Sequence, residues 1–424
     1  MRYVFKKRII CNQKNKEMKK VNTIAVAILL TMTGCGGKSG SESDILITVD
    51  ITKTYPQKEM ILQDFMDVEY IPLETTDEFV NQGVVLAIGK EIILVKNQIN
   101  DGDLFIYDKN GKGLRKINRK GQGGEEYLSI SEAVLDEDNS EILVNDFLLG
   151  KIMVYDLYGK FLRSFPYEEG VLYGNLCNYD RENLICYDAS MAIDFTINTA
   201  NTNESMNYKN EETNKSSYYI ISKRDGSIMK DIQIYIKKKQ ALTGLGFYAG
   251  GPRVARSTYF PLIPYNDSWI MTEYSSDTVF SFSPDYSMDP LLVRTPSIQS
   301  MDPKVLLYLG IITDRYLFMK TEMNQTGSGN RVAGVVTKDH LVYDKQEKTV
   351  YESIVYNGDF SNEITVDMSM QSIIANEIVC MQKIEAFELV EAYRKGQLNG
   401  KLKEIAVKLD EEDNPVIMLL KQKR

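Results

Sequence analysis

A repeat of 48 residues in the first half of the chain limits the fold more than any other sequence feature. Segments 105–115 and 152–163 share six identities at this single offset. In each segment an apolar stretch leads into an Asp and a Gly, and a second apolar stretch follows. Asp and Gly favour turns that need positive φ, so each segment predicts a β-hairpin. The identities are Tyr107/Tyr155, Asp108/Asp156, Gly111/Gly159, Lys112/Lys160, Leu114/Leu162 and Arg115/Arg163.

Weaker copies of the hairpin continue along the chain. A third copy occupies 219–228, and degenerate copies occupy 277–283 and 341–350. A further short apolar strand precedes each of the first two hairpins, at 91–95 and 141–144. About four short strands per repeat are typical of a propeller blade rather than of a helical solenoid.

The length of the chain favours six blades. Five copies are visible, and a sixth blade fits the remaining length. The 390 residues from position 35 onward give 65 per blade, whereas seven blades would leave about 56 each and stay an alternative. We therefore predict an all-β fold: a single six-bladed β-propeller over residues 45–424, with about four antiparallel strands per blade.

Two segments interrupt the β pattern. Residues 190–216 are rich in Asn, Thr, Ser and Glu and predict a polar excursion from blade three. Residues 383–409 carry apolar faces at helical spacing, and Gly396 and Gly400 divide them into two helices. This predicts a helical insertion before the last strand, 416–420.

A strand at the end of the chain suits closure of the ring, because pairing strands from the two ends removes a free sheet edge. Two N-terminal segments could supply the partner strand, 45–49 or 68–71. The sequence leaves both open.

The amino terminus predicts export and lipid attachment. Residues 1–34 combine a basic start with an apolar run at 24–30, which is too short to span a bilayer of about 30 Å. Met18 is the better start, which makes 1–17 an upstream extension. The run ends in Met32-Thr33-Gly34-Cys35, which resembles the bacterial lipobox. The resemblance implies diacylglycerol attachment to the Cys35 sulfur, cleavage before Cys35 and acylation of the new amino group. In this interpretation 35–44 is a lipidated Cys with a flexible tether. A secretory signal with a chance Cys is the alternative.

Charge narrows the classes of partner. Residues 1–34 hold eight Lys/Arg and one Glu, so cleavage changes the formal net charge from −9 to −16. Such an acidic chain disfavours nucleic acid and anionic lipid headgroups. We expect membrane association through the lipid anchor, in the outer membrane, with the leaflet left open.

The cysteines leave one question open. Cys177 and Cys186 flank a predicted turn at 180–183, so they could form a disulfide across a hairpin. Two buried free thiols are the interpretation that we favour. The spacing of cysteines and of the one histidine predicts no zinc site.

The chain resembles the six-bladed β-propeller lipoproteins of Bacteroides-type gut bacteria, which are distant relatives in shape of NHL-repeat propellers. The resemblance covers residues 45–424 and departs from the usual pattern at Gly124, where a Pro is common. It implies the fold and the cell-envelope location, and it implies no established activity. The motifs that carry it are Val68–Thr75, Ile106–Lys112, Gly121–Tyr127 and Asp413–Met418.

Four features could carry chemistry, and for each a structural role is favoured. The glycine-rich segment Gly121–Tyr127 is not a GxGxxG that opens a helix, and His340 has no recognisable catalytic partners. The acidic segments 136–141 and 410–414 lack EF-hand spacing and predict solvated turns. The aromatic group in blade four is ordinary for propeller strands, although it also suits sugar or peptide contact. Its members are Tyr259, Phe260, Tyr265, Trp269 and Tyr274.

The sequence favours a non-enzymatic binding module for a glycan, a peptide or an envelope protein. It identifies no catalytic residue, no metal ligand and no cofactor, and the ligand-binding residues stay unknown. The alternative is a lyase, lactonase or hydrolase that uses carboxylates at the central pore, with or without Ca²⁺, which is an analogy at the level of the fold.

Overall fold

The computed structural model describes residues 46–191, 193–194, 216–236, 243–248, 251–255, 260–324, 335–369 and 378–423. All of them belong to one compact unit that begins at Ile45. Cys35, the lipobox and the tether therefore lie outside the described residues. In the described part, no helix is both long enough and apolar enough to cross a membrane.

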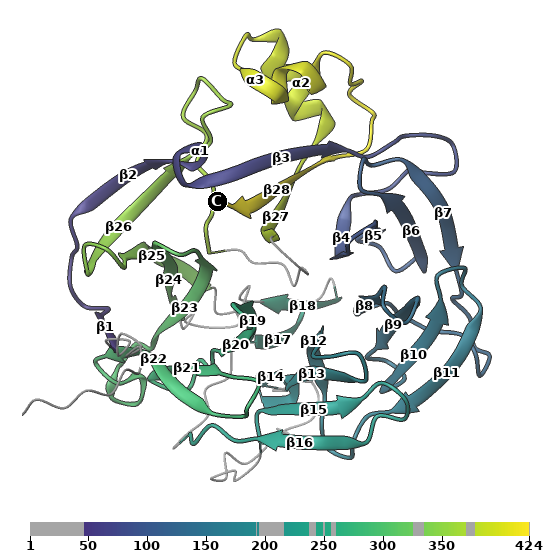
Figure 1. Ribbon diagram of the computed structural model, residues 1–424, viewed down its shortest axis with the longest axis horizontal. Helices are drawn as coiled ribbons and strands as arrows, with labels where there is room; N and C mark the ends of the chain where they lie inside the picture. Colours follow the sequence, from purple (N-terminus) through teal and green to yellow (C-terminus); the bar gives the residue numbers. More distant parts are fainter. Residues whose placement is uncertain are drawn as a thin grey trace, which may run out of the picture. The chain divides into compact units, whose positions relative to one another are not determined.

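Six antiparallel sheets follow one another around a ring, which confirms the predicted all-β, six-bladed propeller (Figure 1). Blade one contains β4 (Val84–Ile88), β5 (Ile92–Lys96), β6 (Asp103–Asp108) and β7 (Gly113–Asn118). Blade two contains β8 (Glu132–Asp136), β9 (Glu141–Asp146), β10 (Lys151–Asp156) and β11 (Phe161–Pro166). Blade three contains β12 (Tyr173–Asn178), β13 (Asn183–Asp188), β15 (Tyr218–Ser222) and β16 (Ile228–Ile232).

The second half of the ring follows the same plan. Blade four contains β19 (Leu262–Tyr265), β20 (Ser268–Met271), β21 (Thr278–Phe282) and β22 (Met288–Thr295). Blade five contains β23 (Val305–Ile312), β24 (Tyr316–Asn324), β25 (Val335–Asp344) and β26 (Thr349–Tyr356). In blade six the described strands are β27 (Ile378–Ile384), β28 (Val416–Gln422) and β3 (Met66–Pro72).

The core consists of apolar layers between consecutive blades. Successive residues of a strand point to opposite faces, so each strand supplies two layers. On β5, Ile92 and Leu94 pack toward blade two, whereas Ile93 and Val95 pack toward blade six. A cluster of this kind fills every one of the six junctions, including the one between blades six and one. The described residues therefore form a closed ring.

The N-terminal segment 46–72 runs along the outer edges of three blades, and we call it the belt (Figure 1). Its strand β1 (Ile47–Asp50) pairs in parallel with β22, and β2 (Gln57–Ile61) pairs in parallel with β26. After the single turn α1 (Leu62–Phe65), β3 pairs antiparallel with β28. Of the two predicted closure partners, 68–71 is thus confirmed, while 45–49 belongs to the strand that extends blade four.

The repeat identities have a physical explanation in the turns between the third and fourth strands. Gly111, Gly159 and Gly226 have φ of 84°, 83° and 76°, a region that L side chains rarely adopt. A Cβ at any of them would also lie within 3.0 Å of the outer strand of the preceding blade. The atoms approached belong to Pro72, Ile117 and Phe165, respectively.

The repeated arginines connect each blade to the one that follows it. Arg115 of blade one donates from Nη1 to the Leu157 carbonyl of blade two, at 3.1 Å. Arg163 of blade two donates from Nε to the Lys223 carbonyl of blade three, at 3.0 Å. The 48-residue repeat therefore encodes contacts between blades as well as hairpins within them.

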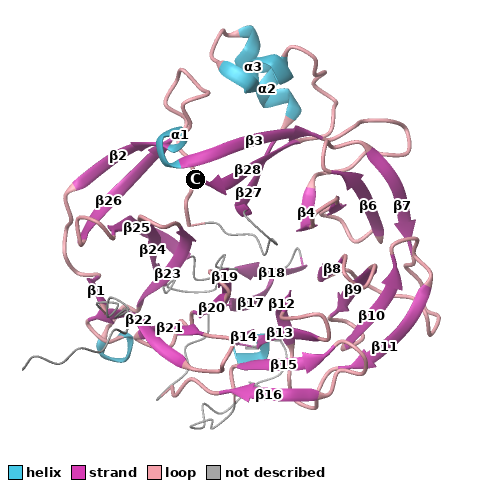
Figure 2. Cartoon of the chain, in the orientation of Figure 1, coloured by secondary structure: helices cyan, strands magenta, loops and turns pink. Residues whose placement is uncertain are grey.

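Of the two predicted interruptions of the β pattern, the helical insertion is confirmed, whereas most of the polar segment 190–216 lies outside the described residues. Between β13 and β15 the structure describes a 3₁₀ turn (Ala189–Met191) and β14 (Ile193–Asp194). β14 pairs in parallel with β17 (Thr243–Tyr248), which pairs with β18 (Gly251–Ala255) in the connection from blade three to blade four. The C-terminal insertion forms α2 (Ala386–Arg394) and α3 (Gly400–Ala406) outside the ring (Figure 2). A second 3₁₀ turn, Ile298–Ser300, links blades four and five.

The thiols of Cys177 and Cys186 are free and buried. Cys177 lies opposite Ile185 on β13, so Cys186 points to the other face of the sheet. Cys177 packs toward blade four and Cys186 toward blade two. Burial raises the pKa of both thiols well above the ordinary value. The favoured interpretation, two buried free thiols, is confirmed.

Candidate functional site

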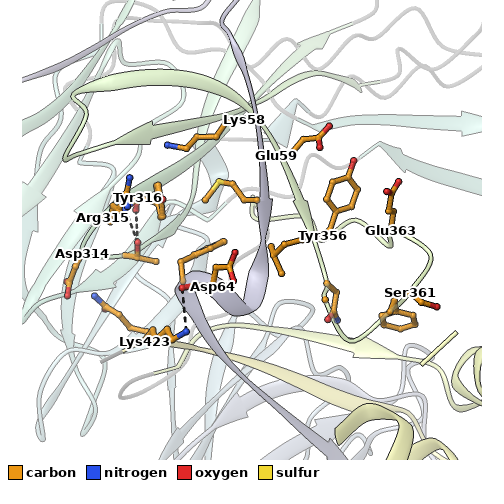
Figure 3. A pocket seen from close by; sticks show the side chains of 18 residues that line it. Lys58, Glu59, Asp64, Asp314, Arg315, Tyr316, Tyr356, Ser361, Glu363 and Lys423 are labelled. Carbon is orange, nitrogen blue, oxygen red and sulfur yellow. Dashed lines mark hydrogen bonds between the residues drawn. The ribbon is translucent and has the colours of Figure 1, made fainter. Parts of the chain in front are cut away.

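A cleft of about 710 Å³ opens between blades five and six, at the seam where the two ends of the chain meet. Its walls come from four segments that are far apart in the sequence: 58–65 of the belt, 313–316 at the β23–β24 turn, 356–363 after β26, and 422–423 at the end of β28. Figure 3 shows these side chains around the opening. A volume of this size lies in the range of small-ligand pockets, about 300–1,000 Å³.

Hydrogen bonds hold the belt rigidly against the floor of the cleft. Gln63 donates from Nε2 to Asn357 Oδ1 at 2.7 Å and to Asp359 Oδ2 at 2.9 Å, and its Oε1 accepts from the Gly358 amide. The Tyr70 hydroxyl of β3 donates to the same Asp359 oxygen at 2.8 Å. Because these partners are already engaged within the chain, the cleft is preformed.

The C-terminal strand adds one more connection to the belt. Lys423 donates from Nζ to the backbone carbonyls of Gln63 and Asp64, at 3.0 and 3.4 Å. These carbonyls lie near the end of α1, where unpaired helical carbonyls favour a cation.

One end of the cleft contains compensated charges. Lys58 and Arg315 both contact the carboxylate of Asp344, each at 2.8 Å, and both also contact Glu347. Burial alone would raise the pKa of Asp344, but hydrogen bonds from Arg315 and Lys58 outweigh it and hold this pKa well below its ordinary value. Lys58 Nζ also lies 4.6 Å from the centre of the Tyr351 ring, a cation–π distance.

Four exposed carboxylates line the cleft without an ion pair to any described residue. Two of them flank the half-buried Tyr356: Figure 3 shows Glu59 and Glu363 beside this ring. Burial raises the pKa of the Tyr356 hydroxyl, and the charges of Glu59 and Glu363 raise it further. The four residues are Glu59, Asp64, Asp314 and Glu363.

The apolar part of the cleft combines aromatic rings with Met60 and Ile61. Phe65 of α1 packs edge-on against Tyr316, with ring centres 5.3 Å apart, and stacks on Phe318 at 5.7 Å. Phe360 also lines the cleft. Tyr316 is 7% exposed, and its hydroxyl makes no hydrogen bond to a described residue. Rings and carboxylates in one preformed cleft are suited to binding a polar ligand with some apolar surface.

The sequence candidates lie elsewhere, and the glycine-rich segment is structural. Tyr127 is fully buried; its hydroxyl donates to the Gly102 carbonyl at 2.6 Å and accepts from the Arg119 amide at 3.0 Å. Glu126 accepts a hydrogen bond from the Gly123 amide within the loop. The favoured structural role of Gly121–Tyr127 is confirmed.

His340 and the blade-four aromatics take no part in the cleft. His340 lies within β25 rather than before it, and its Nδ1 lies 3.8 Å from Asp367 Oδ1. Tyr274 is buried, and Trp269 packs against the core between blades three and four. Phe260 and Tyr265 pack against the core between blades four and five, and Tyr259 lies outside the described residues.

The prediction of solvated acidic turns is wrong for several residues. Asp136 is buried and pairs with the buried Lys223 at 2.7 Å, and Glu137 accepts backbone hydrogen bonds from Glu91 and Ile92 of blade one. Asn414 is buried as well, and its amide bonds to the carbonyl of Glu74. These polar groups connect blades, which the sequence composition of a turn does not reveal. In the described ranges no group of three or more His, Cys, Asp or Glu could hold a metal.

Sequence reasoning missed every residue of the cleft. No motif marks them, because each wall segment is short and ordinary by itself. The only available signal was the predicted proximity of the two chain ends at the closing blade.

Comparison with known proteins agrees with the fold. A putative exported protein from Bacteroides fragilis NCTC 9343 is 15% identical, with 90% of this chain and 100% of that chain covered and a TM-score of 0.57. A member of the DUF4221 family from Bacteroides vulgatus is 11% identical, with 84% and 97% covered and a TM-score of 0.44. No functionally curated protein matches the chain. The resemblance to Bacteroides propellers is thus confirmed for the fold. The model of DUF4934, a domain of unknown function, matches residues 46–421, and the chain therefore belongs to the DUF4934 family.

Proposed function

We propose that this chain is a cell-envelope lipoprotein whose propeller binds a glycan, a peptide or an envelope protein, with the cleft between blades five and six as the ligand site. The preformed cleft of about 710 Å³ carries the proposal. In it, aromatic rings lie beside carboxylates that make no ion pair to a described residue. A ligand with both apolar surface and polar groups matches this lining.

Binding is tested by the thermal stability of the full chain in detergent, with oligosaccharides, peptides and divalent cations as ligands. A ligand at about 100 times its Kd should raise the unfolding free energy by about 2.7 kcal/mol. The shift should be lost in Tyr356→Ala, which removes a cleft side chain. A shift that survives this substitution would place the binding site elsewhere, and a Ca²⁺ shift that a chelator reverses would favour the enzyme alternative.

The location of the protein belongs to the same proposal. Lipid attachment at Cys35 would anchor the chain in the outer membrane, and the similarity to a Bacteroides fragilis protein described as a putative exported protein supports export. The net charge of −16 after cleavage makes nucleic acid an unfavourable partner.

Membrane fractionation tests the anchor. Cys35→Ala should move the protein from the membrane fraction to the soluble fraction, or leave uncleaved precursor, because one acylation site supplies the anchor. Cys11→Ala, upstream of the predicted start, is the matched control and should change nothing. Unchanged fractionation of Cys35→Ala would contradict the lipoprotein assignment.

A further inference from the structure

The charges of the cleft are unequally compensated. The cations Lys58 and Arg315 already share the carboxylates of Asp344 and Glu347, at distances of 2.8–3.1 Å. Lys423 donates to two neutral backbone carbonyls and keeps its positive charge, one against four carboxylates. The carboxylates of Glu59, Asp64, Asp314 and Glu363 have no such partner in the described part of the chain. The field in the cleft is therefore negative, and it favours a cationic ligand.

Two of these carboxylates, Glu59 and Glu363, and the ring of Tyr356 are arranged to bind one cation. Glu59 comes from β2, Tyr356 ends β26, and Glu363 follows in the next connection. Figure 3 shows Glu59 and Glu363 on either side of the Tyr356 ring. An ammonium or guanidinium group gains from this arrangement twice, through charge-assisted hydrogen bonds to the carboxylates and through contact with the ring face.

The Tyr316 hydroxyl offers a further contact to a ligand. The Tyr316 side chain lines the same cleft, and its hydroxyl makes no hydrogen bond to a described residue. This hydroxyl is not one of the buried polar atoms without a partner, so water can bond to it in the free protein and a ligand carbonyl can replace that water. A peptide offers both a backbone carbonyl for Tyr316 and a basic side chain for the carboxylates.

A neutral glycan fits these observations less well. A ligand that covers Glu59 and Glu363 removes water from two negative charges. The hydroxyl groups of a glycan replace the lost hydrogen bonds but supply no positive charge. A lysine or arginine side chain supplies hydrogen bonds and a positive charge.

We propose that the cleft binds a cationic peptide segment, with a lysine or arginine side chain between Glu59 and Glu363 against the Tyr356 ring. This inference rests on the proposed function, because it names the ligand class of the same site.

Fluorescence anisotropy with labelled hexalysine tests the inference on the full chain in detergent, with hexaglutamate and maltohexaose as comparison ligands. The double variant E59Q/E363Q should bind hexalysine about tenfold more weakly, since two close charge contacts are lost. The double variant E78Q/E412Q is the matched control. It removes two charges from exposed residues outside the cleft and should bind within about twofold of the wild type.

The outcomes separate this inference from the proposed function. Equal weakening in both double variants would mean that the overall negative charge attracts hexalysine, and would overturn the inference. Binding of maltohexaose that E59Q/E363Q abolishes, without binding of hexalysine, would also overturn it while the cleft stays a ligand site. Failure of every ligand to bind or to stabilise the chain would contradict the proposed function as well.

Discussion

Single buried carboxylates connect distant segments of the ring, and Asp344 is the clearest case. Its side chain is fully buried and contacts Lys58 of the belt and Arg315 of the β23–β24 turn. Against the effect of burial, these hydrogen bonds lower the pKa of Asp344 in the folded state. Such a carboxylate stabilises the fold above its ordinary pKa, and this contribution disappears as the pH falls toward the folded-state pKa.

Asp344→Asn should therefore destabilise the protein by about 2 kcal/mol at pH 7, because two cations lose their shared partner. The difference from wild type should shrink below about pH 4, where the wild-type carboxyl begins to take up a proton in the unfolded state. Urea unfolding of the wild type and the variant at pH 7 and at pH 3 measures the difference in unfolding free energy at each pH. Asp138→Asn is the control: its ion pair with Lys90 is exposed, and its loss should cost under about 0.5 kcal/mol. A destabilisation equal at both pH values would contradict the linkage.

The position of a terminal strand in its sheet determines how much that strand contributes to the stability of the propeller. β28 lies between β27 and β3 in blade six, whereas β1 lies at the outer edge of blade four. Removal of residues 416–424 leaves β3 without its partner and opens the ring, so cooperative thermal unfolding should be lost. Removal of 47–50 leaves four paired strands and should cost about 3 kcal/mol, mainly from Ile47 and Val49.

Circular dichroism during heating distinguishes the two truncations, since only the second should keep a single sharp transition. A single sharp transition in both truncated proteins would show that β28 contributes little to the cooperative unfolding of the ring.

The elements also differ in how far the sequence could predict them. The hairpins around Gly111 and Gly159 were predictable because positive φ is a local requirement with a sequence signature. The partner of β28 stayed open between two segments, because pairing of the chain ends depends on contacts more than 300 residues apart in the sequence. The parallel edge pairings of β1 and β2 were missed because they also join segments that are more than 200 residues apart in the sequence.

At the level of the whole molecule, the cleft exists only because the ring closes. Its walls join the belt, the β23–β24 turn, the segment after β26 and the end of β28. Glu59, Tyr356 and Glu363 carry no motif, and their chemistry arises from proximity alone. The fold could therefore be predicted from a repeat, whereas the candidate site could not, because it depends on how the last blade meets the first segment.

A ligand in this cleft should consequently stabilise the seam more than the rest of the ring. With hexalysine at about 100 times its Kd, amide hydrogen exchange that needs opening of the seam should slow by up to about 100-fold. We expect the protection in β2, α1 and the end of β28, with blades one to three unchanged. The E59Q/E363Q variant at the same hexalysine concentration should show none of it. Protection spread evenly over all blades would instead mean that opening of the seam is coupled to unfolding of the whole propeller, and that the ring responds to its ligand as one unit.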